Sequence, residues 1–403
     1  MRIVDVNAFY TPAGGGVRTY VRHKLKAAPA LGHEMIVLAP GPEHRVQPVG
    51  DGGLLVTIPA PPLSVDKRYH YFDDEGALHR ALDQWRPDHV EASSPWSSAT
   101  FVGRWQGAAS RSLVMHADPM ASYPYRWFGG VASIETIDRW FNRFWRHLRG
   151  LDQLHDAVIT SGQSMQQRLL ANGLTKVTAV QMGVEPGIFA SSHRSAATRE
   201  RLLAATGLGP NAVLLLAVGR FAAEKRWPMV LRAAQRAARA DGAERPIGLV
   251  LIGDGTRRPQ LERLAWRLDH VAVLPPIADR AELARVVASA DALVHGCESE
   301  TYCMVTSEAR ASGVPLIVPD RGAAVDHLAP GAGLAYASGD EPALAAAMVE
   351  FVAAGPELQR ARARSAIGPG SAGTRSIEDH FTELFALYEG LQGRGRGRAL
   401  LAV

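Results

Sequence analysis

The sequence predicts an α/β fold made of two doubly wound domains, each built on a parallel sheet. The chain has 403 residues, more than one hydrophobic core normally organises, so two domains are expected. Short apolar runs alternate with helical patterns along its whole length. The runs are apolar at consecutive positions, which is typical of parallel strands covered by helices on both faces. Strands and helices that alternate in this way build doubly wound sheets.

The apolar runs are the predicted strands. They are rich in Val, Ile and Leu, and turn residues or helical patterns separate them. In the first half of the chain they are residues 2–6, 34–39, 89–93, 112–116, 156–161 and 177–183. In the second half they are residues 212–220, 248–255, 271–276, 291–296, 315–319 and 333–337.

The boundary between the domains is predicted within residues 184–211, which hold turn residues, a polar patch and one short helix. We therefore expect an N-terminal domain at 1–185 and a C-terminal domain at 186–375. Residues 376–392 are predicted to form a helix that crosses back to the N-terminal domain.

Composition narrows the class of protein. The chain is 47% hydrophobic and 21% charged, which is ordinary for a soluble enzyme. The first residues show no basic stretch followed by an apolar run and a cleavage site, and every apolar run is too short to span a bilayer. We expect a cytoplasmic protein whose two cysteines are free thiols. The basic residues are spread along the chain and match no nucleic-acid motif, which argues against a nucleic-acid binder.

The segment "HGCESETYCMVTSEARASGVPLIVP", residues 295–319, places Glu300 and Glu308 around the start of a predicted helix. If the segment is helical throughout, eight residues separate the two carboxylates by about 12 Å, a spacing that suits two sugars joined by a diphosphate. The helix N-terminus between them would face the phosphates. The alternative is that Glu300 simply favours the dipole at the start of the helix and Glu308 lies on a solvated helix face, and an isolated pair favours that alternative.

The same segment resembles the E-x7-E motif of the family 4 retaining glycosyltransferases. Three further segments, "GGGVRTYV", "AVGRFAAEKRW" and "LIGDG", resemble other elements of that family in the same order, so the likeness spans residues 14–322. The resemblance implies the GT-B architecture, two Rossmann-like domains that face each other across a cleft. It also implies an acceptor-side N-terminal domain and a C-terminal domain that binds a nucleotide diphosphate sugar.

The resemblance assigns roles to individual residues. Arg220 and Lys225 would hold the donor diphosphate in place of a metal ion, and the chain has no Asp-x-Asp sequence to hold one. Read physically, a cation at the carboxyl end of a strand suits a diphosphate, and the alternative is an ion pair with Glu224. Glu300 would bind the transferred sugar and Glu308 the nucleotide ribose. His116 would contact the donor sugar near the reacting carbon; a lone histidine is otherwise more often a core residue. The remaining donor-binding candidates are Gly15, Gly16, Gly219, Gly253, Tyr302, Cys303 and Met304.

The sequence also departs from the family pattern. The usual E-G-F-G-L is Glu300-Thr301-Tyr302-Cys303-Met304, so both glycines are replaced and the donor geometry is expected to differ. Lys225 is followed by Arg226, where the family has glycine. Pro275 and Pro276 stand in the loop that commonly reads the base, which leaves the nucleotide open.

Residues 137–151 are predicted to form an amphipathic helix with an aromatic face and an arginine face. Two interpretations stay open, a helix at a membrane surface and an ordinary surface helix. The order "SSPWS", "HADP" and this helix is similar to the glycolipid-forming branch of the family, which includes the sulfoquinovosyltransferases. The candidates for acceptor or membrane contact are Asp118, Trp96, Trp140, Arg143, Trp145 and Arg146.

These observations predict transfer of a hexosyl group, with retention, from a nucleotide diphosphate sugar to an acceptor hydroxyl. A UDP-hexose is favoured over GDP-mannose, the acceptor is expected to be a small molecule or a lipid at the inner face of the membrane, and neither cofactor nor metal is expected. One alternative is a sugar phosphorylase or epimerase on the same fold. A pyridoxal-dependent phosphorylase would need a Schiff-base lysine in the C-terminal half, where Lys225 is the only lysine. The other alternative is a nucleotide-sugar-binding protein without activity.

Overall fold

A computed structural model describes residues 1–11, 16–50, 52–64, 66–129, 131–240, 245–367 and 375–400, with the side chains of 66, 68 and 393–400 left out. The chain forms two compact units. Unit 1 comprises Met1–Met182 together with Ile377–Val403, and unit 2 comprises Gly183–Ser376.

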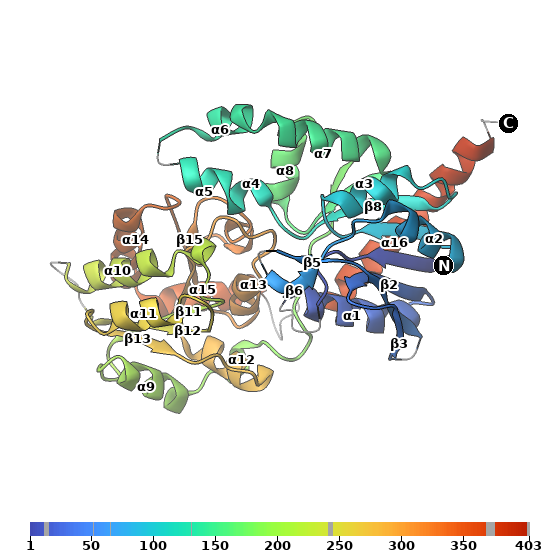
Figure 1. Ribbon diagram of the computed structural model, residues 1–403. Helices are drawn as coiled ribbons and strands as arrows, with labels where there is room; N and C mark the ends of the chain where they lie inside the picture. The colour runs from blue at the N-terminus through green and yellow to red at the C-terminus, as the bar shows by residue number, and fades with distance from the viewer. Residues whose placement is uncertain are drawn as a thin grey trace. The chain divides into compact units, whose positions relative to one another are not determined.

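Unit 1 is built on an eight-stranded sheet in the order β10-β9-β8-β7-β1-β2-β4-β3 (Figure 1). All neighbours are parallel except the edge pair β3 and β4. The strands are β1 (Arg2–Val6), β2 (Glu34–Gly41), β3 (Arg45–Val49), β4 (Gly53–Pro59), β7 (His89–Ala92), β8 (Ser110–Met115), β9 (Ala157–Thr160) and β10 (Val177–Ala179). A separate short ribbon pairs β5 (Pro62–Leu63) with β6 (Asp66–His70).

Helices cover both faces of this sheet because successive strand residues point to opposite sides. Ile3 packs into a cluster with α1 (Gly16–Ala30) and α16 (Ile377–Leu400). Val4 and Val6 pack into another with α2 (Glu75–Trp85), α3 (Ser97–Arg104), α7 (Asn142–Leu154) and α8 (Gln163–Ala171). The remaining helices of unit 1 are α4 (Pro119–Ser122), α5 (Pro124–Phe128) and α6 (Ile134–Trp140).

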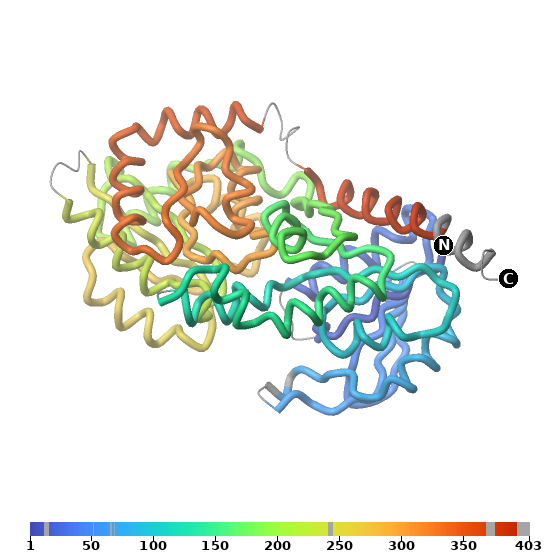
Figure 2. The backbone as a smooth tube through the Cα atoms, turned by 90° about the horizontal axis from the view of Figure 1, so that it is seen from above, coloured from blue at the N-terminus to red at the C-terminus, as the bar shows by residue number. Residues whose placement is uncertain are grey.

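Helix α16 lies far from the other elements of unit 1 in sequence and belongs to the core of that unit. Phe381, Leu384 and Phe385 are buried among residues of α1, β1 and β2. The Tyr388 ring stacks on His89 with centroids 3.9 Å apart, and its hydroxyl donates to Glu91. Figures 1 and 2 both show this helix, in red, running along the N-terminal strands.

Unit 2 is built on a six-stranded, fully parallel sheet in the order β13-β12-β11-β14-β15-β16. Buried clusters lie on its two faces. The strands are β11 (Val213–Val218), β12 (Ile247–Ile252), β13 (Val271–Leu274), β14 (Ala292–Val294), β15 (Leu316–Pro319) and β16 (Gly333–Tyr336). The helices are α9 (Ala196–Ala205), α10 (Trp227–Ala238), α11 (Arg258–Ala265), α12 (Arg280–Ser289), α13 (Met304–Ala311), α14 (Glu341–Ala353) and α15 (Pro356–Ile367). Three short 3-10 turns are η1 (Ser191–His193), η2 (Ala223–Lys225) and η3 (Val325–His327).

The structure confirms the α/β fold with two sheets, one fully parallel and one parallel except for the β3–β4 pair, and each predicted strand overlaps an observed one. The strands β3 to β6 were not predicted. They lie within residues 45–70, where prolines interrupt the apolar runs and most of the strands are short. The helix predicted at 137–151 is interrupted, because Phe141 leaves helical geometry at φ −97° and ψ 21° and separates α6 from α7.

Candidate functional site

Several predicted donor residues lie at or near one edge of the sheet in unit 2. Strands β12, β11 and β14 are neighbours, and their carboxyl ends lead directly into Gly253, Gly219 and His295. Sheets of this kind bind ligands at that edge, where loops rather than helices meet the strand ends. The edge therefore brings the loop that holds Lys225 beside the loop that holds Glu300.

Lys225 and Glu300 form an ion pair between these two loops. The ammonium donates to Oε1 of Glu300, and both side chains are mostly buried. Arg220 differs, because its side chain is 76% exposed and lies 3.8 Å from Glu224 in a contact that solvent screens. The alternative pairing with Glu224 thus applies to Arg220 and not to Lys225. A mobile ammonium and an exposed guanidinium at a strand end are well suited to an anionic ligand.

A second ion pair, which the sequence did not indicate, lies beside the first. Nε of Arg226 donates to Glu298 over 2.9 Å, and Nη2 makes a further contact with the same carboxylate. This two-point contact between a guanidinium and a carboxylate has a fixed geometry. The pair therefore joins the loop that holds Lys225 to the loop that holds Glu300, at the residue that follows Lys225.

Cys303 and Arg226 stand where the family has glycine, and both keep a left-handed backbone. Cys303 has φ +64° and Arg226 has φ +51°, a region that residues with a Cβ rarely adopt. Both residues therefore have a backbone conformation that glycine adopts without steric cost. Because Cys303 caps α13, the helix begins only at Met304. The spacing of about 12 Å predicted between Glu300 and Glu308 assumed a continuous helix and does not apply.

The strain at Cys303 is testable by substitution. We expect Cys303→Gly to be more stable than Cys303→Ala by about 1 kcal/mol, because only glycine adopts the left-handed region without steric cost. Urea unfolding of both variants, with equal m values, gives the difference. Cys297, whose backbone φ is not positive, is the matched control, and there the alanine variant should be the more stable one. Equal stability of the two Cys303 variants would show that no strain is stored.

Glu308 lies buried in α13 and is held by Arg280 from α12. Nη2 of Arg280 lies 2.9 Å from Oε1 of Glu308, and the same guanidinium is 2.9 Å from Oε2 of Glu185. The guanidinium carbon lies 4.8 Å from the Phe189 ring centroid. Burial raises the pKa of the Glu308 carboxyl, and Arg280 counteracts that rise. Sequence reasoning missed Arg280 and Glu185, since neither belongs to a motif.

The remaining donor-side candidates are divided between the two units. Gly219 has φ +156°, and a Cβ on Gly253 would lie 2.0 Å from the Gly219 carbonyl oxygen, so close packing of the backbone alone requires glycine at 253. The Tyr302 hydroxyl lies 2.8 Å from Ser307 Oγ, and Met304 is partly exposed at the first position of α13. In unit 1, Gly16 begins α1, whereas Gly15 lies outside the described residues.

His116 lies in unit 1, just after β8, at the carboxyl edge of that sheet. Its ring meets Tyr20 edge to face with centroids 4.9 Å apart, and burial lowers its pKa to about 4. The imidazole is therefore neutral at pH 7. Nearby, the fully buried Lys24 ammonium lies 3.2 Å from Asp5 and also contacts Glu91.

Two of the acceptor-side candidates have structural explanations. The Asp118 carboxylate caps α4 by accepting the Ala121 N–H at 3.0 Å and also pairs with Arg168. Trp145 was a candidate for acceptor or membrane contact on the aromatic face of the predicted helix, and the structure contradicts such contact. Its ring is buried in the core of unit 1, and Nε1 donates to Asp138 over 3.0 Å.

An exposed aromatic patch does exist, on α5, on α6 and on the residue before α5; the two helices pack against each other (Figure 1). We define it as Tyr123, Trp127 and Trp140, which are 52%, 59% and 58% exposed. Tyr123 lies 5.5 Å from Trp127, and Trp140 lies 5.7 Å from Phe128, centroid to centroid. Trp96, another candidate for acceptor or membrane contact, is exposed outside this patch, and its ring lies beside that of Phe144. Arg143 and Arg146 are exposed on α7.

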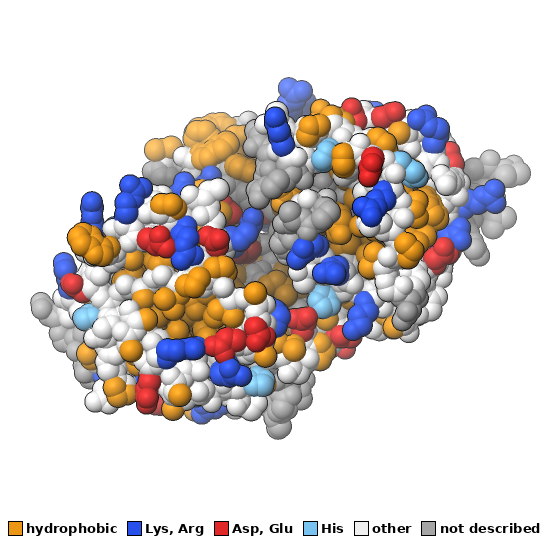
Figure 3. All heavy atoms as spheres, turned by 60° about the horizontal axis from the view of Figure 1, so that its bottom comes forward, with side chains coloured by type: hydrophobic (Ala, Val, Ile, Leu, Met, Phe, Trp, Pro, Cys, Tyr) orange, Lys and Arg blue, Asp and Glu red, His pale blue; other side chains and the backbone are white. Residues whose placement is uncertain are grey.

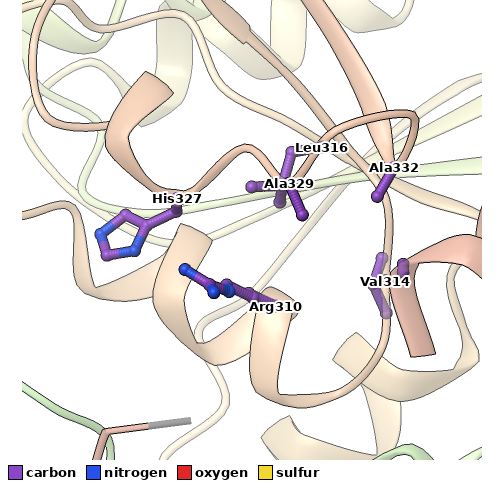
Figure 4. A pocket seen from close by; sticks show the side chains of 7 residues that line it. Arg310, Val314, Leu316, His327, Ala329 and Ala332 are labelled. Atoms are coloured by element: carbon purple, nitrogen blue, oxygen red, sulfur yellow. The ribbon is translucent and has the colours of Figure 1, made fainter. Parts of the chain in front are cut away.

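Two further surface features bear on the site. On the face that Figure 3 shows, Lys and Arg side chains are scattered among acidic and apolar ones rather than gathered together. A small hollow in unit 2 has His327 and Arg310 on one side and Val314, Leu316 and Ala332 on the other (Figure 4). Its cavity volume of about 10 Å³ is far below that of pockets that enclose drug-sized ligands, so it is no candidate for a nucleotide sugar.

No helix in the described part of the chain combines the length and the apolar character that crossing a membrane requires.

Comparison with known proteins identifies the family. Residues 15–185 match the model described as "Glycosyl transferase 4-like domain", and residues 212–354 match "Glycosyl transferases group 1". The chain is 29% identical to a "GDP-mannose-dependent alpha-mannosyltransferase" of Mycobacterium tuberculosis, over 98% of both chains. It is 26% identical to a "GDP-mannose-dependent alpha-(1-6)-phosphatidylinositol dimannoside mannosyltransferase" of the same species, over 90% of both.

Among solved structures, sucrose-phosphate synthase from Thermosynechococcus elongatus shares the fold with a TM-score of 0.75 and 19% identity, over 98% of this chain and 99% of that one. Since the two family models together match most of the chain, it belongs to the family 4 type of GT-B glycosyltransferases, which transfer a glycosyl group from a nucleotide sugar.

Proposed function

We propose that the protein transfers mannose from GDP-mannose to a lipid-linked acceptor, with retention at the anomeric carbon. The observation that carries the donor site is the Lys225–Glu300 ion pair at the carboxyl edge of β11 and β14. In this proposal the pair supplies a cation that binds the diphosphate and a carboxylate that binds sugar hydroxyls. GDP-mannose is chosen over a UDP-hexose because two relatives that match at least 90% of the chain carry GDP-mannose in their names.

In this proposal each of several residues of unit 2 binds a different part of the donor. When donor binds, the Lys225 ammonium leaves Glu300 and binds the diphosphate, and Arg220 adds a second positive charge from its exposed position. Glu300 is then available to accept hydrogen bonds from the sugar. Glu308, with Oε1 on Arg280, presents its other oxygen to the ribose hydroxyls. The N-terminus of α13 adds backbone N–H groups that favour negative charge.

Retention follows if the acceptor attacks from the face on which the diphosphate departs. In that step the acceptor oxygen bonds to the anomeric carbon, the bond to the diphosphate oxygen breaks, and the acceptor proton passes to the departing phosphate. Lys225 and Arg220 stabilise the negative charge that develops there, so this step needs no metal ion. The contact predicted between His116 and the donor sugar remains a prediction.

Calorimetry against GDP-mannose, GDP-glucose and UDP-glucose tests the donor assignment, followed by transfer assays with lipid extracts and NMR of the product anomer. We expect micromolar binding of GDP-mannose and an α-linked product. Preferential binding of UDP-glucose would replace the proposed donor, and an inverted product would exclude the same-face mechanism. Binding without transfer or hydrolysis would favour the nucleotide-sugar-binding alternative.

The aromatic patch supports a membrane-bound acceptor. Tryptophan and tyrosine at a surface favour the boundary between lipid head groups and acyl chains, and Arg143 and Arg146 lie on the neighbouring helix α7. We expect the double variant Trp127→Ala, Trp140→Ala to bind vesicles of phosphatidylglycerol and phosphatidylcholine about tenfold more weakly than the wild type. Vesicle co-sedimentation measures this.

Trp266 offers a matched control. It is an exposed side chain of the same kind, 88% exposed, but it lies at the end of α11 in unit 2 and is not part of the aromatic patch. Trp266→Ala should bind vesicles as the wild type does. If the double variant and the control bind equally well, the patch has no part in membrane contact.

A further inference from the structure

Three side chains at the carboxyl edge of β14 bring together the atoms of a metal site. His295, Glu300 and Cys303 each offer one ligand atom, and these atoms lie within 4.8 Å of one another. His295 is only 1% exposed, and neither of its ring nitrogens has a hydrogen-bond partner within the described residues. Imidazole, thiolate and carboxylate are all ligands of zinc. An imidazole buried without a partner is costly, and a metal ion would satisfy one of its nitrogens.

The backbone fixes two of the three ligands. His295 directly follows β14, where its N–H donates to Ile317 over 2.9 Å and its carbonyl accepts from Tyr336 over 2.8 Å. Cys303 is fixed as the residue that caps α13. Glu300 lies in the loop between them, with Oε1 3.5 Å from Nε2 of His295. In a tetrahedral zinc site the ligand atoms are about 3.3–3.8 Å apart, so these three need to approach one another by at most about 1.5 Å.

The positive charge of Lys225 beside Glu300 determines how a bound metal ion would affect the site. The Lys225 ammonium contacts the same Glu300 oxygen, and two cations cannot share it without strong repulsion. Lysine has a long, flexible stem, so its ammonium moves away more readily than the backbone-held ligands do. An ion bound here therefore takes Glu300 from Lys225 and also from a donor sugar.

We propose that His295, Glu300 and Cys303 bind a thiophilic divalent cation, zinc, when no donor is bound, and that the bound ion inhibits glycosyl transfer. The Cys303 thiol loses its proton to solvent as the sulfur–zinc bond forms. The three protein ligands leave a fourth position for water. The binding step stands on the geometry alone, whereas the inhibition rests on the proposed function.

Cobalt(II) is the probe for binding, because a cobalt–thiolate bond adds a charge-transfer absorption band that aqueous cobalt lacks. Full-length protein, treated with a chelator and dialysed, is titrated with cobalt and then with zinc. We expect the band to grow to one equivalent and zinc to abolish it. Cys303→Ser and His295→Phe should each lose the band, and Cys297→Ser should keep it, since that thiol is outside the cluster.

No thiolate band in the wild type would overturn the proposal, as would an undiminished band in both Cys303→Ser and His295→Phe. Loss of the band in Cys297→Ser alone would move the site to the other cysteine and also overturn it. Circular dichroism of each variant verifies that it is folded.

Inhibition is measured separately, as zinc titrations of transfer from GDP-mannose. We expect at least a tenfold loss of wild-type rate, restored by chelator, and a loss several-fold smaller in Cys303→Ser relative to its own metal-free rate. A cobalt band in a protein that transfers no sugar would contradict the proposed function and leave the metal site intact. Glycosyl transfer by a protein that shows no cobalt band would support the proposed function and contradict the metal site.

Discussion

Lys225→Ala is expected to lower kcat for glycosyl transfer by about 100- to 1,000-fold, with a much smaller change in the donor KM. The charge on the departing diphosphate is largest in the transition state, so a cation aimed at it contributes most there. Lys225 is the only lysine of unit 2 in the sequence, and its nearest substitute, Arg220, is mostly exposed. Steady-state kinetics with GDP-mannose separate the effect on kcat from that on KM.

Lys26→Ala is the control for general effects of losing a positive charge, because Lys26 is exposed on α1 in unit 1. Its kinetics should equal those of the wild type. If Lys225→Ala raises KM and leaves kcat unchanged, the lysine binds the ground state and transition state equally well. Its proposed role on the leaving group would then be incorrect.

Glu308→Gln is expected to weaken GDP-mannose binding by about 10- to 100-fold, because hydrogen bonds to a charged acceptor contribute about 1.5–3 kcal/mol. Arg280 keeps Glu185 as a partner in this variant, so the guanidinium is not left unpaired. Burial raises the pKa of Glu308 above that of an ordinary glutamate. Wild-type binding should therefore weaken as the pH falls through that pKa, since the protonated carboxyl accepts fewer hydrogen bonds. Calorimetry over a pH series measures both effects.

Glu350→Gln serves as the matched control, because this glutamate is exposed near the end of α14. It should bind donor with wild-type affinity. In Glu308→Gln the pH-dependent part of binding should disappear. Wild-type affinity and an unchanged pH profile in that variant would remove Glu308 from the donor site.

The sheets were predictable from sequence because a parallel strand covered on both faces is apolar at every position. "VLLLAV" in β11 and "IGLVLI" in β12 show this signal, and both strands are almost completely buried. Strand β3 lacks it, because it is an exposed edge strand interrupted by Pro48. The surroundings of Trp145 stayed open at the level of sequence, because a helical wheel gives one apolar face and does not say whether membrane or protein covers it. Here the protein core covers that face.

The candidate site was predictable only in part. Glu300 and Lys225 belong to segments with a recognisable pattern, and parallel topology brings the ends of β11 and β14 together. Arg280 and Glu185 are 95 positions apart in sequence, and only folding brings them into contact. Arg226 and Glu298 are similarly 72 positions apart. A pairing at such separation leaves no local signal in a single sequence, so neither contact could be predicted, even though Arg226 and Glu298 lie in segments that carry motifs.

The place of α16 in the core of unit 1 has a consequence for biosynthesis. On the ribosome, Met1–Met182 emerges first, but Tyr388 and Phe381 follow only after all of Gly183–Ser376 has been made. At about 5–20 residues per second, that delay is roughly 10–40 s. During this time the apolar surface around Ile3, Met35 and Val37 lacks its covering helix. The sheet of the first unit is complete in sequence at Ala179, but the face that α16 covers stays open until the second unit has been made, so the nascent N-terminal half is the part that benefits most from chaperone protection.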